Sequence, residues 1–110
     1  MSTKQEVDWA EIYKLSTKRT VESHKKLERI INQLVKCGVL VFIHKLPKKG
    51  KYTLYELIDH ATNLNPSINE TDSYFKHEKD AVDYMNIMYE KFNKHAYLSP
   101  IEIENGEIVK

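Results

Sequence analysis

Cysteine is nearly absent from this 110-residue sequence, and glycine and proline are scarce. There is one cysteine, Cys37, with three glycines and three prolines. A lone cysteine excludes an intramolecular disulfide, and without clustered histidines it does not fit a structural zinc site. So few glycines leave little of the flexible backbone with which nucleotide enzymes cradle phosphates. We expect Cys37, directly before Gly38, to be a small buried residue in the last turn of a helix.

Long apolar runs are also missing. No segment approaches the roughly 18 apolar residues that a membrane span needs, and the opening MSTKQEVDWA has no apolar stretch of signal-peptide length. We therefore expect no membrane partner and a cytoplasmic location. A chain of 110 residues should form a single domain, residues 1–110, around one modest core.

Motifs of catalysis are absent as well. The sequence contains no P-loop, no dinucleotide-binding glycine pattern, no HExxH and no nucleophile elbow. Its five histidines, at positions 24, 44, 60, 77 and 95, are scattered along the chain. We expect the protein not to be an enzyme, with no catalytic residues, no metal ligands and no cofactor.

The feature that the sequence does contain is an uneven distribution of charge. Residues 1–52 hold 12 basic and 5 acidic side chains, a net charge of +7, and residues 53–110 hold 5 basic and 11 acidic ones, a net charge of −6. This asymmetry points to one surface that faces a polyanion and to a separate acidic surface. The alternative is that the two halves attract one another within the fold or in a dimer.

A long amphipathic helical segment is expected over residues 3–37. The residues Thr3-Lys4-Gln5-Glu6 have the form of a capping box, and Trp9, Ile12 and Tyr13 make an apolar face. One unbroken helix would be about 52 Å long, whereas a compact domain of this size is roughly 34 Å across. Either the helix breaks near 16–20, where serine and threonine compete for backbone hydrogen bonds, or it overhangs and a second copy covers it. We favour the break; the alternative is a homodimer through the N-terminal helix.

A β-hairpin formed by 39–46 and 51–58 is expected next. The apolar run Val39–Ile43 follows Gly38, and Pro47-Lys48-Lys49-Gly50 would form the turn. Residues 51–61 also have helical spacing of their apolar side chains, so a helix is the alternative there. We expect a strand because 39–46 needs a partner and because tyrosine, threonine and isoleucine favour strands.

The rest of the chain predicts a loop, a helix and a second hairpin. The loop covers 63–73, and the helix covers 76–95 with a core line of methionine, alanine and aromatic residues. The C-terminal hairpin pairs 101–104 with 107–110 through an Asn105-Gly106 turn, and it places Ile103 opposite Ile108. The predicted fold class is therefore α+β.

The candidate binding residues are cations of the N-terminal helical segment and of the first hairpin's turn, with one tyrosine among them. Such cations neutralise phosphates, and an aromatic ring stacks on a base. The alternative for the turn is a solvated loop whose lysines guard against edge pairing. The candidates are Lys18, Arg19, Lys25, Lys26, Arg29, Lys45, Lys48, Lys49, Lys51 and Tyr52.

Residues 8–58 resemble a winged helix-turn-helix domain. The order is helix, polar turn, basic helix, glycine, strand, basic turn and strand, and the resemblance is carried by LSTKRTVESHKKLERIINQLVKCGVLVFIHKLPKKGKYTL. The resemblance implies a basic helix presented to a DNA groove, with a basic wing on the flanking phosphates.

Two functions follow from these observations. The first is that of a small nucleic-acid-binding regulatory protein, with DNA as the expected partner, that uses the basic helix and the basic turn. The alternative is a protein-interaction module, such as a phage or mobile-element inhibitor or adaptor, in which the acidic half or the last hairpin docks on a partner protein.

Overall fold

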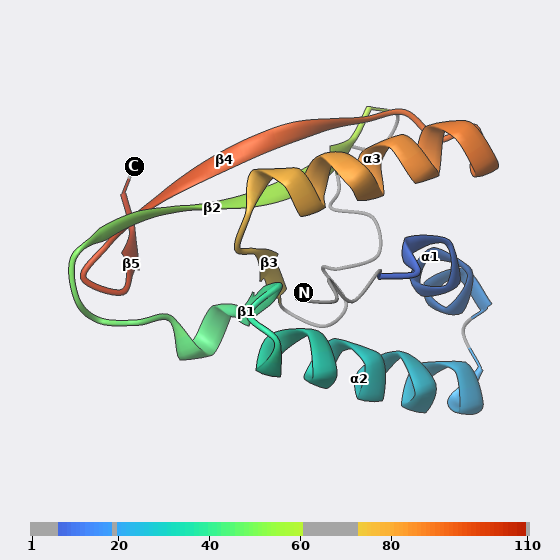
Figure 1. Ribbon diagram of the computed structural model, residues 1–110, viewed down its shortest axis with the longest axis horizontal. Coiled ribbons are helices and arrows are strands. Elements are labelled where there is room, and N and C mark those ends of the chain that lie inside the picture. Colours follow the sequence, from blue (N-terminus) through green and yellow to red (C-terminus); the bar gives the residue numbers. More distant parts are fainter. Residues whose placement is uncertain (1–6, 19, 61–72, 110) are drawn as a thin grey trace, which may run out of the picture.

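The structure, a computed structural model, describes residues 7–18, 20–60 and 73–109, and it confirms the α+β class. Figure 1 shows α3 running beside the long ribbon of β2 and β4, with α1 and α2 on the far side of α3. The elements in chain order are α1 (Trp9–Lys18), α2 (Val21–Lys36), β1 (Leu40–Phe42), the 3-10 turn η1 (Ile43–Lys45), β2 (Lys51–Asp59), β3 (Ser73–Phe75), α3 (Glu78–Phe92), β4 (Ala96–Glu104) and β5 (Glu107–Ile108).

The N-terminal helical segment is two helices, as expected: α1 ends at Lys18 and α2 begins at Val21. The hydroxyls of Ser16 and Thr17 donate to backbone carbonyls three residues earlier, at 2.7 and 2.9 Å, so serine and threonine bond to the backbone in the last turn of α1. Thr20 then caps α2: its hydroxyl accepts from the Ser23 N–H at 3.1 Å, and the Ser23 hydroxyl accepts from the Thr20 N–H at 3.0 Å. The break keeps the molecule within 37 × 35 × 32 Å.

The pairing of 39–46 with 51–58 is wrong. The strand order is β1-β3-β2-β4-β5, so β3 lies between the two strands that were expected to be neighbours. Leu40 is opposite Phe75, and Phe42 is opposite Ser73. The predicted ladder required residues 43–46 to be extended, but 43–45 form η1, and the short β1 pairs with a strand from the end of the expected loop.

The strand expected over 51–58 is confirmed as β2, and its principal partner is β4. Leu57 is opposite Leu98, and Tyr55 is opposite Pro100. Proline is tolerated inside β4 for a geometric reason. Val109 donates to the Glu102 carbonyl on the β5 side, and Pro100, two residues away, directs its nitrogen to the same side, beyond the end of β5.

The C-terminal hairpin has the expected turn and register. Ile103 is opposite Ile108, and Glu104 is opposite Glu107. The turn residues Asn105 and Gly106 have φ angles of 52° and 84°, as the tight Asn-Gly turn requires. Of the expected 107–110, the strand β5 covers Glu107–Ile108 and Val109 adds a bond to the Glu102 carbonyl, while residue 110 lies outside the described residues.

The main core lies between the three helices and the sheet. Tyr84 and Met88 of α3, which are 0% and 1% exposed, belong to it, as the spacing predicted, and Met85 packs against it. Tyr89, which the same spacing placed in the core, is 56% exposed. Trp9 of α1 packs its ring 5.4 Å from that of Phe75 and 5.3 Å from that of Tyr84. A smaller cluster on the other face of the sheet contains Leu54, Tyr74 and Ile103.

The expectation for Cys37 is wrong, because its side chain is exposed. Leu34 is the last buried residue of α2, and Cys37 follows the last turn as the C-cap. Gly38, at φ 80°, then turns the chain so that Leu40 is the next residue to enter the core.

Parts of four earlier expectations lie outside the described residues: the capping box at 3–6, the candidate Arg19, the loop as far as residue 72, and residue 110 of the last hairpin. Within the described ranges, no helix is long and apolar enough to cross a membrane.

Candidate nucleic-acid interface

The outward face of α2 carries a row of cations. Leu27, Ile31 and Leu34 are buried against the core. Lys25, Arg29 and Lys36 are all exposed. They are spaced four and seven residues apart, which at about 100° per residue places them on one line directly opposite Leu27. We call Lys25, Arg29 and Lys36 the α2 stripe.

Lys36 was not among the sequence candidates, although the signal for it was present. It lies seven residues after Arg29 and eleven after Lys25. These spacings place Lys36 on the same side of the helix as the other two residues. Within the described residues, no acidic group lies within ion-pair distance of the stripe. The nearby His24 and Glu28 instead approach one another at 3.7 Å.

Lys26 has a different role from its neighbour Lys25. Its ammonium lies 3.3 Å from the Glu11 carboxylate, so it links α2 to α1. Both side chains are about half exposed, which makes this a weak surface pair. Lys18 is exposed at the end of α1. The sequence grouped these lysines with the stripe, but only the stripe residues share one line on α2.

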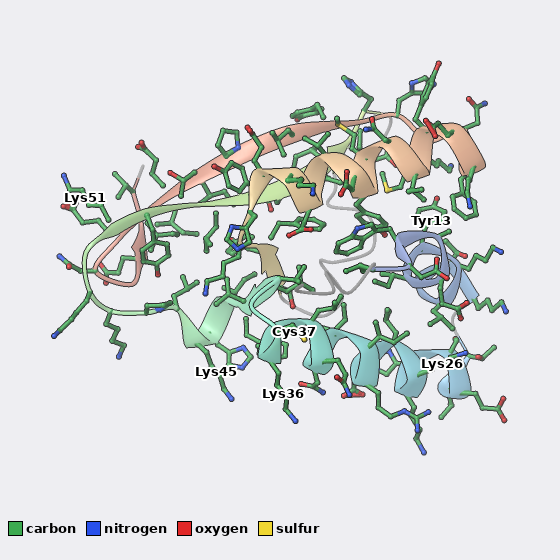
Figure 2. The ribbon with its side chains drawn as sticks, viewed as in Figure 1. Tyr13, Lys26, Lys36, Cys37, Lys45 and Lys51 are labelled. Atoms are coloured by element: carbon green, nitrogen blue, oxygen red, sulfur yellow. The ribbon has the colours of Figure 1, made fainter. Side chains whose placement is uncertain are left out.

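The second group of cations lies between β1 and β2. Lys45 ends η1, and Lys48 and Lys49 are exposed in the connection to β2. We call residues 45–51 the basic loop. Figure 2 shows Lys36 and Lys45 projecting toward the same side of the molecule, so the α2 stripe and the start of the basic loop share one face.

The basic loop joins β1 and β2, which are not neighbours in the sheet, so it is not the tip of a hairpin. A hydrogen bond from Tyr52 nevertheless holds its backbone. The Tyr52 hydroxyl donates to the Pro47 carbonyl at 2.8 Å. Desolvation raises the pKa of the Tyr52 phenol above its ordinary value of 10.0. Tyr52 is half-buried, and its main contacts are with the smaller core cluster.

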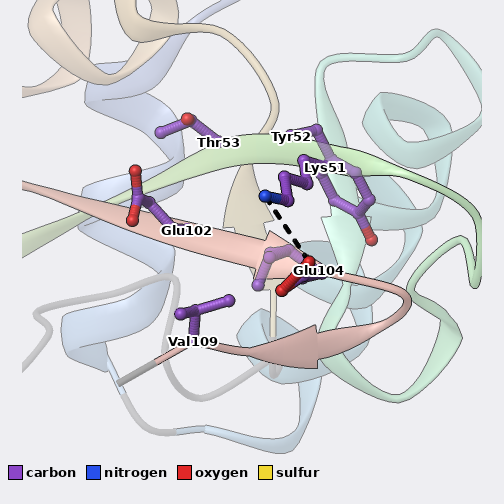
Figure 3. A pocket seen from close by; sticks show the side chains of 7 residues that line it. Lys51, Tyr52, Thr53, Glu102, Glu104 and Val109 are labelled. Carbon is purple, nitrogen blue, oxygen red and sulfur yellow. Dashed lines mark ion pairs between the residues drawn. The ribbon is translucent and has the colours of Figure 1, made fainter.

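Lys51 faces the acidic C-terminal hairpin. Its ammonium is 3.6 Å from the Glu104 carboxylate, across the β2–β4 ladder. Figure 3 shows this pair at the edge of a shallow pocket of about 240 Å³, which Thr53, Glu102 and Val109 also line. This one exposed ion pair joins a cation of residues 1–52 to an acid of residues 53–110.

A second shallow pocket, of about 510 Å³, lies beside the C-terminal hairpin. It is lined by Thr53, Pro100, Ile101, Glu102, Ile108 and Val109. No group of three or more histidine, cysteine or acidic side chains in the described part of the chain is arranged to hold a metal ion.

Comparisons of the chain with protein-family models, with curated protein sequences and with solved structures find no match. The resemblance to a winged helix-turn-helix gains no support from them. Its wing also required the pairing of 39–46 with 51–58, and β3 separates these strands. Only the pair α1 and α2, joined at the polar turn, agrees with the resemblance.

Proposed function

We propose that the protein is a small nucleic-acid-binding protein with a regulatory role, and that it binds duplex DNA through the α2 stripe and the basic loop. The observation that carries this proposal is the α2 stripe. Its three exposed cations form one line, and no acidic residue among those described lies within ion-pair distance of it. Exposed cations in a row without such an ion pair are suited to binding phosphates, and releasing the counterions of DNA favours such binding.

The dimensions of α2 are compatible with a DNA groove. Its 16 residues span about 24 Å, and the major groove, about 12 Å wide, admits one α-helix. In this arrangement Lys25 and Arg29 lie near the bases or the groove walls, while Lys45, Lys48 and Lys49 bind flanking phosphates. The first two then influence sequence choice more than the loop lysines do.

The experiment compares two variants of equal net charge. The stripe variant is Lys25→Gln/Arg29→Gln/Lys36→Gln, and the matched control is Lys79→Gln/Lys91→Gln/Lys94→Gln, which removes three exposed lysines from α3 and the residues after it. Binding to a fluorescent random-sequence duplex is measured by anisotropy at about 50 mM salt, where contacts with phosphates are strong.

We expect the stripe variant to raise the Kd on the order of 10- to 100-fold and to lower the salt slope by up to about 2.7, at roughly 0.9 per phosphate contact. The control should change the Kd less than about twofold, because its lysines lie away from the interface. Equal losses in both variants would mean that only net charge matters. A wild-type protein that retains no duplex DNA or RNA at micromolar concentration would refute the proposal.

The second candidate function, a protein-interaction module, is favoured by the C-terminal hairpin. Ile108 and Val109 are 45% and 44% exposed, and they line the 510 Å³ pocket beside Glu102. An exposed apolar pair with an acidic rim suits a partner segment that carries apolar and basic residues. Loss of partner capture in Ile108→Ser/Val109→Ser, together with no DNA binding by the wild type, would favour this second function.

A further inference from the structure

The basic loop is attached to the C-terminal turn by a reciprocal pair of hydrogen bonds. The Asn105 N–H donates to the Gly50 carbonyl at 2.9 Å. The Gly50 N–H in turn donates to the side-chain Oδ1 of Asn105 at 3.3 Å. The two residues are 55 positions apart in the sequence, so the bonds connect the basic end of β2 to the acidic hairpin.

The side chain of Asn105 supplies an acceptor that the backbone at this position does not. In a regular antiparallel ladder, two opposed residues exchange both N–H···O bonds through their backbones. Gly50 and Asn105 are the next opposed pair after Lys51 and Glu104. Asn105 has turned into the left-handed region at φ 52°, and its Oδ1 accepts the bond from the Gly50 N–H in place of the carbonyl.

Two further contacts attach the loop to the same turn. A side-chain carbon added at Gly106 would lie 3.1 Å from Lys48 Cγ, so the Lys48 chain crosses directly over the glycine. Lys51 pairs with Glu104 at 3.6 Å, immediately before the turn. The Asn-Gly turn therefore contacts the basic loop at Lys48, Gly50 and Lys51.

We propose that Asn105 is a positioning residue of the nucleic-acid interface: it holds the backbone of the basic loop so that Lys48 and Lys49 are presented to phosphates. This inference rests on the proposed function. The reason is preorganisation, because a loop that is ordered before binding loses less conformational entropy when it meets DNA. Asn105 bears no charge, so its effect on binding acts through the loop.

The test uses Asn105→Gly, which tolerates the positive φ of the turn and removes the side chain with its acceptor. The first measurement is hydrogen exchange at the Gly50 amide, with Asn105→Asp as the conservative variant that keeps an oxygen acceptor. We expect faster exchange in Asn105→Gly and near-wild-type exchange in Asn105→Asp.

The second measurement is duplex affinity in the wild type and in two variant backgrounds, the stripe variant and Lys48→Gln/Lys49→Gln, with the fluorescent duplex described above. Asn105→Gly should raise the Kd about two- to tenfold, the range for one hydrogen bond, in the wild type and in the stripe variant. In Lys48→Gln/Lys49→Gln the same substitution should leave the Kd unchanged, because the cations that it positions are gone. A general loss of structure would act in both backgrounds.

The outcomes separate the two proposals. Unchanged exchange at Gly50, or equal affinity losses in the stripe and loop backgrounds, would overturn the role of Asn105 while the wild type still binds DNA. A wild-type protein without DNA binding would overturn the proposed function, and the role of Asn105 in binding with it.

Discussion

The two basic surfaces of this protein are held in place by different means. The α2 stripe projects from one 16-residue helix, and its geometry depends on helical spacing and on the cap at Thr20. The basic loop shares only Lys45 with η1, and its end is attached by hydrogen bonds and an ion pair to the Asn105-Gly106 hairpin. One surface depends on local contacts, and the other depends on contacts with the end of the chain.

This difference means that the two surfaces should respond to different substitutions. A change at the C-terminal turn should disturb the loop and leave α2 intact. A change at the start of α2 should affect the stripe and leave the loop intact. A change in the core that supports both surfaces should alter the stability of the whole protein without affecting one surface more than the other. The substitutions below follow this logic, from the largest expected effect to the smallest.

Gly106→Val should have the largest effect. A β-branched residue at φ 84° is strained, and its Cβ would lie 3.1 Å from Lys48 Cγ. We expect a loss of about 1–3 kcal/mol in the free energy of unfolding and weaker DNA binding, measured by denaturant titration and anisotropy.

The matched control for that substitution is Gly38→Val. Gly38 has the same sign of φ, at 80°, but no neighbouring atom lies within 4 Å of an added side-chain carbon. It should therefore show the strain without the displacement of Lys48. Equal losses of DNA affinity in the two variants would contradict the link between the turn and the loop.

Thr20→Ala should have an intermediate effect, confined to α2. The substitution removes the hydroxyl that accepts from the Ser23 N–H, and loss of such a cap costs about 1 kcal/mol. Thermal unfolding and amide exchange in the first turn of α2 measure it, and Thr20→Ser, which keeps a hydroxyl, is the control. Faster exchange at Gly50 in Thr20→Ala would show that the two surfaces are not independent.

Tyr84→Phe should have the smallest effect at neutral pH. The Tyr84 hydroxyl is buried and has no hydrogen-bond partner among the described residues, so its removal should not lower the melting temperature. Burial raises the pKa of this phenol well above 10.0, with a smaller contribution from Tyr13.

The raised pKa gives the sign of a pH dependence. The folded state holds the Tyr84 proton more tightly than the unfolded state, so stability is retained below pH 10 and falls as the pH rises above it. Tyr84→Phe should lose less stability than the wild type in this alkaline range. Identical alkaline losses, or a substantial loss of stability at pH 7, would contradict the assignment.

The features that sequence could predict are those set by neighbouring residues. The break before Thr20, the Asn105-Gly106 turn and the Lys25–Arg29 spacing all depend on residues a few positions apart. The pairing of β1 was mispredicted because its partner, Phe75, lies 35 positions after Leu40 and no local pattern joins them. The contact of Gly50 with Asn105 depends on the pairing of β2 with β4. The sequence pattern did not predict that pairing, so it could not predict the contact.

The candidate site was predicted in part for the same reason: local spacing is visible in the sequence, and long-range contacts are not. Periodicity could select the outward residues of α2, but it could not show that Lys26 is paired with Glu11 or that Lys51 is paired with Glu104. Those two ion pairs depend on how α1 meets α2 and how β2 meets β4.

The central claim, that both basic surfaces bind phosphates, is tested most directly by the salt dependence of duplex binding. The slope of log Kobs against log salt concentration is measured for the wild type, the stripe variant and Lys45→Gln/Lys48→Gln/Lys49→Gln. Six phosphate contacts predict a wild-type slope of up to about −5.4, and each triple variant should reduce its magnitude by up to about 2.7. A loop variant with the wild-type slope would remove the loop from the interface, and a wild-type slope near zero would contradict the claim altogether.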